Sequence, residues 1–224
     1  SPRPTVEKPL SLIVNGDFTA ALDDNWRGAS GERLKVSVVD ADVAGFRRAV
    51  RLESDPPEGG QPWSVGYGQK CVGAVRKGDA VYFRAWMRSP DRCRVTFIFE
   101  MAAPPNTKSI SQQAALTPEW KEYRFVGRAG QTFAPGESQA KWFLGHGKGV
   151  VEIAGARVEN YGAARGHQFD QTIDYWGGRA HPDDWRQPAL ARIERIRKGD
   201  LAIRVVDAAG KPVKGATVRV AQRR

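Results

Sequence analysis

Two neighbouring segments of the sequence alternate between apolar and polar residues over their whole length. In Ala80–Ser89 the alternation sets one apolar face against one polar face, and Arg92–Met101 repeats the pattern. A two-residue period is the signature of a β-strand with one buried face. The expected core positions are Val81, Phe83, Ala85, Met87, Cys93, Val95, Phe97 and Phe99, and the expected outward positions include Arg84, Trp86, Arg88, Arg94, Ile98 and Glu100.

Shorter segments of the same kind recur along the first 162 residues. Strands are expected at 12–14, 34–39, 49–54, 63–70, 109–115 and 121–126, with turn residues between them. Lys141–Gly162 is expected to be the closing hairpin, two strands joined by a Gly-rich turn. The spacing predicts an all-β antiparallel β-sandwich (jelly roll) over 12–162, after an extended arm at 1–11.

The pattern changes after residue 162. Residues 163–182 read as a linker, and 183–224 as one α-helix and a C-terminal β-hairpin. The helix is expected to begin near Trp185, where apolar residues recur at helical spacing. The hairpin strands are expected at 201–206 and 216–220, around a turn at 207–212.

Composition narrows the classes of function. The formal net charge is +10, yet no nucleic-acid-binding module is recognisable, so a solvated basic surface or attraction to an acidic polymer is expected instead. No apolar run is long enough to cross a membrane. The N-terminal residues show no signal pattern, so a signal either was removed or never existed. Seven Trp exceed what packing needs and hint at aromatic platforms on a surface.

The first 162 residues resemble the jelly-roll carbohydrate-binding modules of families four, nine and twenty-two. The resemblance rests on the order of short marks: Asn15–Phe18, Trp26, Lys77–Phe83 leading to Trp86, Thr117–Trp120, Phe143–Gly145 and Val151–Ile153. It implies a non-catalytic module that binds a polysaccharide in an aromatic-lined groove.

Residues 192–222 resemble the segment that precedes the catalytic barrel in bacterial family-ten glycoside hydrolases, which are mostly endo-1,4-β-xylanases. This implies a secreted, periplasmic or cell-surface parent enzyme whose barrel is not in this chain, so the chain itself is not expected to be an enzyme. The expected partners are xylan, or another β-1,4-linked glycan such as glucan, and the attached catalytic domain. The alternative is a structural domain that docks on that barrel without binding sugar.

Sugar rings have flat apolar faces and a rim of hydroxyls, so a binding site needs aromatic rings beside polar side chains. The candidates are aromatic or polar residues on expected outward faces. Arg84 and Trp86 are expected to share one groove with Arg94 and Glu100. The set is Trp63, Tyr67, Gln69, Arg84, Trp86, Arg94, Glu100, Phe143 and His146. In the closing hairpin the parity is open: if Leu144 is core, Phe143 faces the groove, and otherwise Trp142 does.

Two further sites are weighed. The resemblance implies a structural calcium near Asp17, but the acidic pair that the family carries in its last strand is Ala154-Gly155 here. No other cofactor is expected. Cys71 and Cys93 fall in neighbouring expected strands, so they either form a disulfide or remain two buried thiols.

Overall fold

The computed structural model describes residues 9–22, 25–28, 33–163, 169–172, 191–195 and 202–220. The chain divides into two compact units, 1–179 and 180–224. Most of the expected arm, most of the linker and the start of the expected helix near Trp185 lie outside the described residues. None of the described helices is long and apolar enough to cross a membrane.

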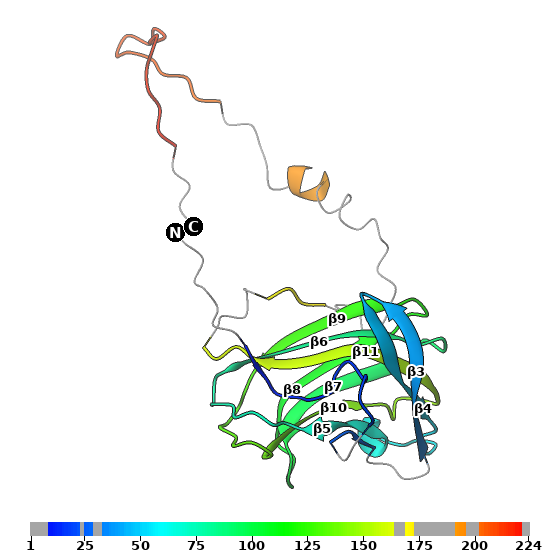
Figure 1. Cartoon of the computed structure of the whole chain (residues 1–224). Helices are drawn as coiled ribbons and strands as arrows, with labels where there is room; N and C mark the ends of the chain where they lie inside the picture. Colours follow the sequence, from blue (N-terminus) through cyan, green and yellow to red (C-terminus); the bar gives the residue numbers. More distant parts are fainter. Residues whose placement is uncertain are drawn as a thin grey trace. The chain divides into compact units, whose positions relative to one another are not determined.

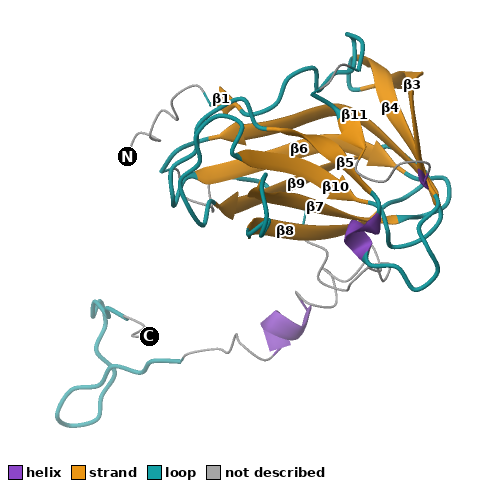
Figure 2. Ribbon diagram, turned by 90° about the horizontal axis from the view of Figure 1, so that it is seen from below, coloured by secondary structure: helices purple, strands orange, loops and turns teal. Residues whose placement is uncertain are grey.

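The first unit is a sandwich of two antiparallel sheets (Figures 1 and 2), as the alternating strands predicted. Sheet A has the order β3-β4-β11-β6-β9, and β1 also pairs with β11. Its strands are β1 (Leu10–Ser11), β3 (Leu34–Val43), β4 (Phe46–Ser54), β6 (Ala80–Arg88), β9 (Lys121–Arg128) and β11 (Gly149–Asn160).

Sheet B has the order β2-β5-β10-β7-β8. Its strands are β2 (Arg27–Gly28), β5 (Gly66–Lys70), β7 (Arg94–Met101), β8 (Lys108–Ala115) and β10 (Ser138–Phe143). A short 3-10 helix, η2 (Pro62–Ser64), precedes β5, where the sequence predicted a continuous strand from residue 63.

The predicted closing hairpin is wrong. β10 pairs with β5 and β7 in sheet B, whereas β11 pairs with β4 and β6 in sheet A. The Gly-rich segment between them therefore crosses from one sheet to the other. β6 and β7 are likewise consecutive strands in different sheets, so their outward faces lie on opposite sides of the sandwich.

Aromatic rings fill the space between the sheets. The Trp26 ring lies parallel to Tyr67 and Trp142, with centroids 5.5 and 5.9 Å away. Phe83 of sheet A meets Phe97 of sheet B at 4.1 Å. Offset stacking of this kind adds to the stabilisation that burial of the rings provides. The predicted core positions of β6 and β7 belong to this cluster, except Cys93, which packs against it half-buried.

Residues 169–172, in the middle of the expected linker, pack against the edge of sheet A. The Thr172 backbone N–H donates to the Arg124 carbonyl at 2.7 Å, and the Tyr82 hydroxyl donates to the Asp170 carbonyl at 2.8 Å. The Phe169 ring lies 4.9 Å from that of Tyr82. This segment therefore covers part of the exposed edge strand β9.

In the second unit, residues 191–195 are helical, and 202–220 contain a turn instead of the two predicted strands. One isolated bridge pairs Val206 with Pro212, and the Gly210 N–H donates to the Asp207 carbonyl at 2.9 Å. The predicted turn position is therefore right.

Candidate functional site

The predicted site residues divide between two opposite faces. Arg84 and Trp86 lie on the outward face of sheet A, because they alternate with the core residues of β6. Glu100 and Phe143 lie on the outward face of sheet B, on β7 and β10. The expectation that Arg84 and Trp86 share one groove with Arg94 and Glu100 is wrong, since β6 and β7 belong to different sheets.

Tyr67 and Gln69 face the interior, so the prediction that they contact sugar is wrong. Tyr67 is 1% exposed and belongs to the main core cluster. Burial raises the pKa of its hydroxyl. Gln69 is 4% exposed, and its side-chain amide accepts from the Val14 N–H at 3.0 Å and donates to the Val14 carbonyl at 2.9 Å. These two hydrogen bonds therefore hold the Val14 backbone, just before the turn at Asn15, against β5.

The parity of β10 is settled by Leu144 and Trp142, which both belong to the core cluster. Phe143 and Lys141 alternate with them and lie on the outward face. Phe143 and its neighbour Ile98 are buried and yet outside both core clusters. The middle of this outward face is therefore shielded from solvent without being part of the core.

Glu100 is the most enclosed charged group on this face, at 1% exposure. Its Oε1 accepts from the Gln139 amide at 2.9 Å and lies 2.7 Å from the Lys141 Nζ. Its Oε2 is buried and has no hydrogen-bond partner, with Lys108 Nζ 3.6 Å away. The charge of Lys108 therefore compensates this oxygen without a hydrogen bond of normal length.

Two lysine side chains lie near the ring of Phe143. Lys141 Nζ lies 5.3 Å and Lys108 Nζ 5.8 Å from its centroid. Lys108 was not among the residues predicted from the sequence. It reaches this place because the pairing of β7 with β8 slips by one residue, so that Glu100 lies opposite Lys108.

His146 joins the same face from the segment after β10. Its Nε2 lies 2.7 Å from the Thr96 hydroxyl of β7. Burial lowers the pKa of His146, and the positive charge of Arg94 lowers it further. His146 is therefore neutral near pH 7 and has one nitrogen that accepts and one that donates. Arg94, His146, Glu100 and Phe143 therefore belong to one outward face, with Arg94 and Glu100 six residues apart on β7, roughly 20 Å.

Trp63 is 59% exposed, an unusual placement for the largest side chain. It belongs to η2, whose Pro62 carbonyl accepts from the Gly145 N–H at 2.9 Å. A Cβ on Gly145 would lie 2.4 Å from the Gln61 carbonyl oxygen, so only glycine allows this approach. This contact holds the helix beside the segment that carries His146. We call Trp63 and the outward residues Thr96, Glu100, Lys108, Lys141, Phe143 and His146 the sheet B face.

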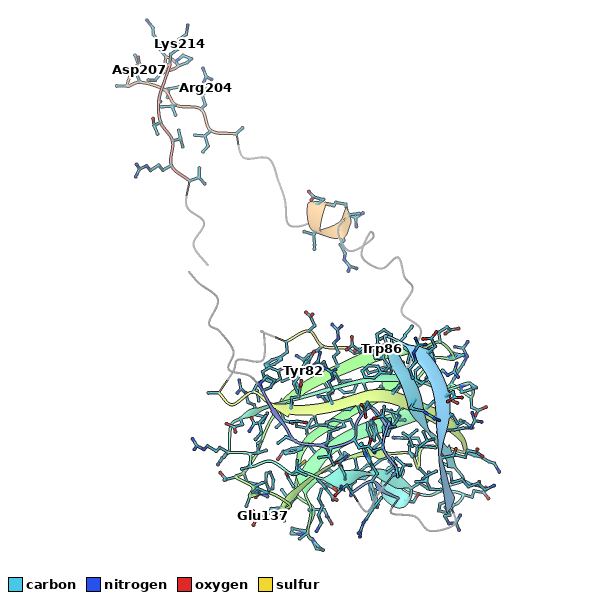
Figure 3. All side chains as sticks on the ribbon, in the orientation of Figure 1. Tyr82, Trp86, Glu137, Arg204, Asp207 and Lys214 are labelled. Atoms are coloured by element: carbon cyan, nitrogen blue, oxygen red, sulfur yellow. The ribbon has the colours of Figure 1, made fainter. Side chains whose placement is uncertain are left out.

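The outward face of sheet A is held by ion pairs and rings. Glu152 accepts from Arg51 at 2.7 Å and from Arg88 at 2.6 Å. Arg88 also lies over the Trp120 ring, 4.8 Å from its centroid. Trp86 packs in a small apolar cluster with Phe46 and Trp120, among others. Trp86 is labelled on this side of the sandwich in Figure 3.

The calcium predicted at Asp17 would need oxygen donors from several residues. Calcium takes about six to eight oxygen ligands. Among the described residues no group of three or more His, Cys, Asp or Glu side chains is placed to hold a metal. The Asp17 carboxylate accepts from the Thr19 N–H and hydroxyl, and Arg157 brings a positive charge to the hollow that Asp17 lines. A calcium ion at Asp17 stays a prediction.

Cys71 and Cys93 are free thiols, so the disulfide alternative is wrong. The N–H of Cys71 donates to the Ser138 carbonyl, and Ser138 pairs with Met101 at the far end of β7 from Cys93. Eight residues of strand separate those ends, roughly 26 Å at about 3.3 Å per residue. A disulfide needs Cα atoms within about 7 Å.

The fold of the first unit is similar to that of known proteins, although the sequence is not. No protein-family model matches the sequence, and no curated protein matches it. A CBM4 carbohydrate-binding module is similar in structure, with a TM-score of 0.50 and 16% identity over 65% of this chain and 97% of that one. The arabinose-bound α-L-arabinofuranosidase MgGH51 is similar with a TM-score of 0.53 and 13% identity, over 67% of this chain and 26% of that one. The first unit therefore has the β-sandwich fold of a carbohydrate-binding module.

Proposed function

We propose that this chain binds polysaccharide without catalysis, through the sheet B face. The observation that carries the proposal is the exposed Trp63, held next to the segment of His146 at the border of an outward face that carries the enclosed carboxylate of Glu100. We expect a sugar hydroxyl to donate to that carboxylate when the Lys108 and Lys141 side chains, which pair with it, move aside. The likeness to the CBM4 module supports the same role.

The other residues of the sheet B face fit the two halves of a sugar ring. The exposed Trp63 offers an apolar surface for the C–H face, and the buried ring of Phe143 packs near the two lysines. Lys141 and Lys108 donate to ring or hydroxyl oxygens, and neutral His146 both donates and accepts. Few fixed polar groups beside aromatic rings are the usual composition of a preformed ligand site.

The ligand we propose is a β-1,4-linked plant polysaccharide, with xylan first. The resemblance of residues 192–222 to the segment before a family-ten barrel favours xylan and a secreted parent enzyme similar to endo-1,4-β-xylanases. Binding then keeps an attached catalytic domain near its substrate, so the gain is in effective concentration and not in chemistry.

Affinity electrophoresis tests the proposal. The full chain is run through gels that contain xylan, mixed-linkage glucan or hydroxyethylcellulose. Retardation is expected, strongest in xylan, and Trp63→Ala with Phe143→Ala should abolish it. Trp120→Ala, on the outward face of sheet A, is the matched aromatic control and should leave it unchanged.

The outcome that would overturn the proposal is free migration in all three gels. Retention lost equally in the Trp120→Ala control would also count against the sheet B face. If the chain binds no polysaccharide but associates with a separately produced barrel, the structural alternative replaces it.

A further inference from the structure

A row of three arginines crosses the outward face of sheet A, opposite the sheet B face. In the strand register, Arg157 of β11 lies opposite Arg84 of β6, and Arg84 lies opposite Arg124 of β9. Side chains directly opposite each other on neighbouring antiparallel strands are about 5 Å apart at Cβ, and like charges there are unfavourable. The row therefore needs negative charge close by.

Among the described residues, carboxylates pair with two of the three arginines. Arg124 pairs with Glu122, and with Asp170 at 3.4 Å. Arg84 pairs with Glu159 at 3.2 Å. Arg157 is exposed, and no hydrogen bond or ion pair engages its side chain among the described residues. The Nε of Arg84 is also buried without a hydrogen-bond partner.

Arg157 lines two neighbouring hollows. One, of about 280 Å³, is lined by Ala44, Phe46, Arg84, Trp86, Glu122, Gly155 and Arg157. The other, of about 340 Å³, shares Phe46, Gly155 and Arg157 and extends to Asp17 and Glu159. Each is of the order of a small-molecule site, about 300 Å³ at the lower end.

A β-bulge shapes this junction. The pairing of β11 with β6 shifts between Ala154 and Arg157, and Gly155 has a φ of +58°. A Cβ on Gly155 would lie 2.2 Å from the ring of Phe46, so the glycine lets that ring close over the strand. The bulge thereby brings Arg157 to the same hollow that the rings of Phe46 and Trp86 line.

We infer that this junction is a second binding site, for a carbohydrate that carries a carboxylate, such as a uronic acid residue. Arg157 binds the carboxylate, and the neighbouring guanidinium of Arg84 adds positive charge. The Trp86 ring offers an apolar surface to the sugar ring. A carboxylate ligand gives Arg157 an ion-pair partner, whereas a neutral sugar does not.

The acidic groups nearby do not take that place. Glu122 is already paired with Arg124, and Glu159 with Arg84. Asp17 lines the second hollow but makes no ion pair with Arg157, and its carboxylate accepts from Thr19. Within the described part of the chain, Arg157 therefore has no ion-pair partner, and it lines a hollow together with Phe46 and Trp86.

The test compares two ligands that differ in one group, methyl β-D-glucuronoside and methyl β-D-glucoside. Each is titrated into the full ¹⁵N-labelled chain, and amide shifts report both the site and the Kd. We expect the glucuronoside to shift amides of β6 and β11 around Trp86 and Arg157, with a Kd at least tenfold lower than that of the glucoside. Raising the salt to 0.5 M should weaken binding, because charge pairing drives it.

Arg157→Gln should lower the glucuronoside affinity to that of the glucoside. Its melting temperature should not fall, because Arg157 has no ion pair or hydrogen bond to lose among the residues that the structure describes. Arg76→Gln removes the same charge from an exposed position outside both hollows and should change nothing. Phe143 belongs to the sheet B face, so Phe143→Ala should also leave glucuronoside binding unchanged. The inference about this site and the proposal about the sheet B face can therefore be refuted independently of each other.

Equal affinity for the two sugars, or undiminished binding by Arg157→Gln, would overturn the inference. So would the absence of any shift with either sugar. Shifts confined to β5, β7 and β10 would assign the carboxylated sugar to the sheet B face instead.

Discussion

Replacement of Glu100 by Gln tests whether the sheet B face is built around an enclosed charge. Glu100 is 1% exposed and holds Lys141 at 2.7 Å and Gln139 at 2.9 Å. Gln keeps the shape and one acceptor oxygen but removes the charge. The two lysines then lose their carboxylate partner.

The magnitude follows from burial on each side of the pair. Removing one partner of a fully buried ion pair costs about 3–5 kcal/mol. Here the Lys141 and Lys108 side chains are 18% and 44% exposed, so water takes over part of the lost interaction. We expect Glu100→Gln to lower the free energy of unfolding by about 2 kcal/mol. With an m-value of about 2 kcal/mol/M, the urea midpoint falls by about 1 M.

Urea titration followed by Trp fluorescence measures this shift. Glu53→Gln is the matched control, because Glu53 is 46% exposed and lies 3.4 Å from Arg51. An exposed pair of that kind contributes under about 1 kcal/mol. A double-mutant cycle with Lys141→Met should give a coupling of about 1 kcal/mol. If Glu100→Gln costs no more than Glu53→Gln, the argument for an enclosed charge fails.

Three further predictions concern the structure around this face. Gly68→Ala should cost about 2 kcal/mol, because its Cβ would lie 2.3 Å from the β10 backbone; Gly147→Ala, with open space around it, should be nearly neutral, and equal costs would refute this. The pKa of His146 is lowered on folding, so the unfolded chain binds the proton more readily and stability should fall as pH drops below about 6.5; His146→Gln should remove that part of the pH dependence in urea titrations. Burial raises the pKa of Cys71 to about 12, so a thiol reagent at pH 8 should label Cys93 alone in the native protein, and labelling of both would contradict this placement.

The strands and their inward faces were predictable because alternation is a local property. β6 and β7 were located to within about two residues, with the expected core positions in the core cluster. The β-sandwich class followed from the number and spacing of such strands. A two-residue period needs no knowledge of which strand lies next to which.

Sheet membership was not predictable in the same way. Whether a short connection turns back or crosses to the other sheet depends on pairing with distant strands, such as β10 with β5. The expected groove does not form, because the consecutive strands β6 and β7 belong to different sheets and their outward faces lie on opposite sides of the sandwich. For the same reason, β10 and β11 are joined by a segment that crosses between the sheets and not by a hairpin turn.

Tyr67 shows a signal that was present but not used. Gly66 and Gly68 alternate with it, and glycines contribute no side chain to a core. The face of β5 that carries Tyr67 therefore had to be the inward one. Lys108 had no such signal, since the slip in register between β7 and β8 brings it opposite Glu100.

The central claim is that polysaccharide binds on the outward face of sheet B. Titration of the ¹⁵N-labelled chain with xylohexaose tests it most directly, because each amide shift reports its own strand. The account predicts shifts concentrated on β5, β7 and β10, including Glu100 and Phe143, and on Trp63. Shifts concentrated on β4, β6 and β11, or no shifts at millimolar xylohexaose, would contradict it.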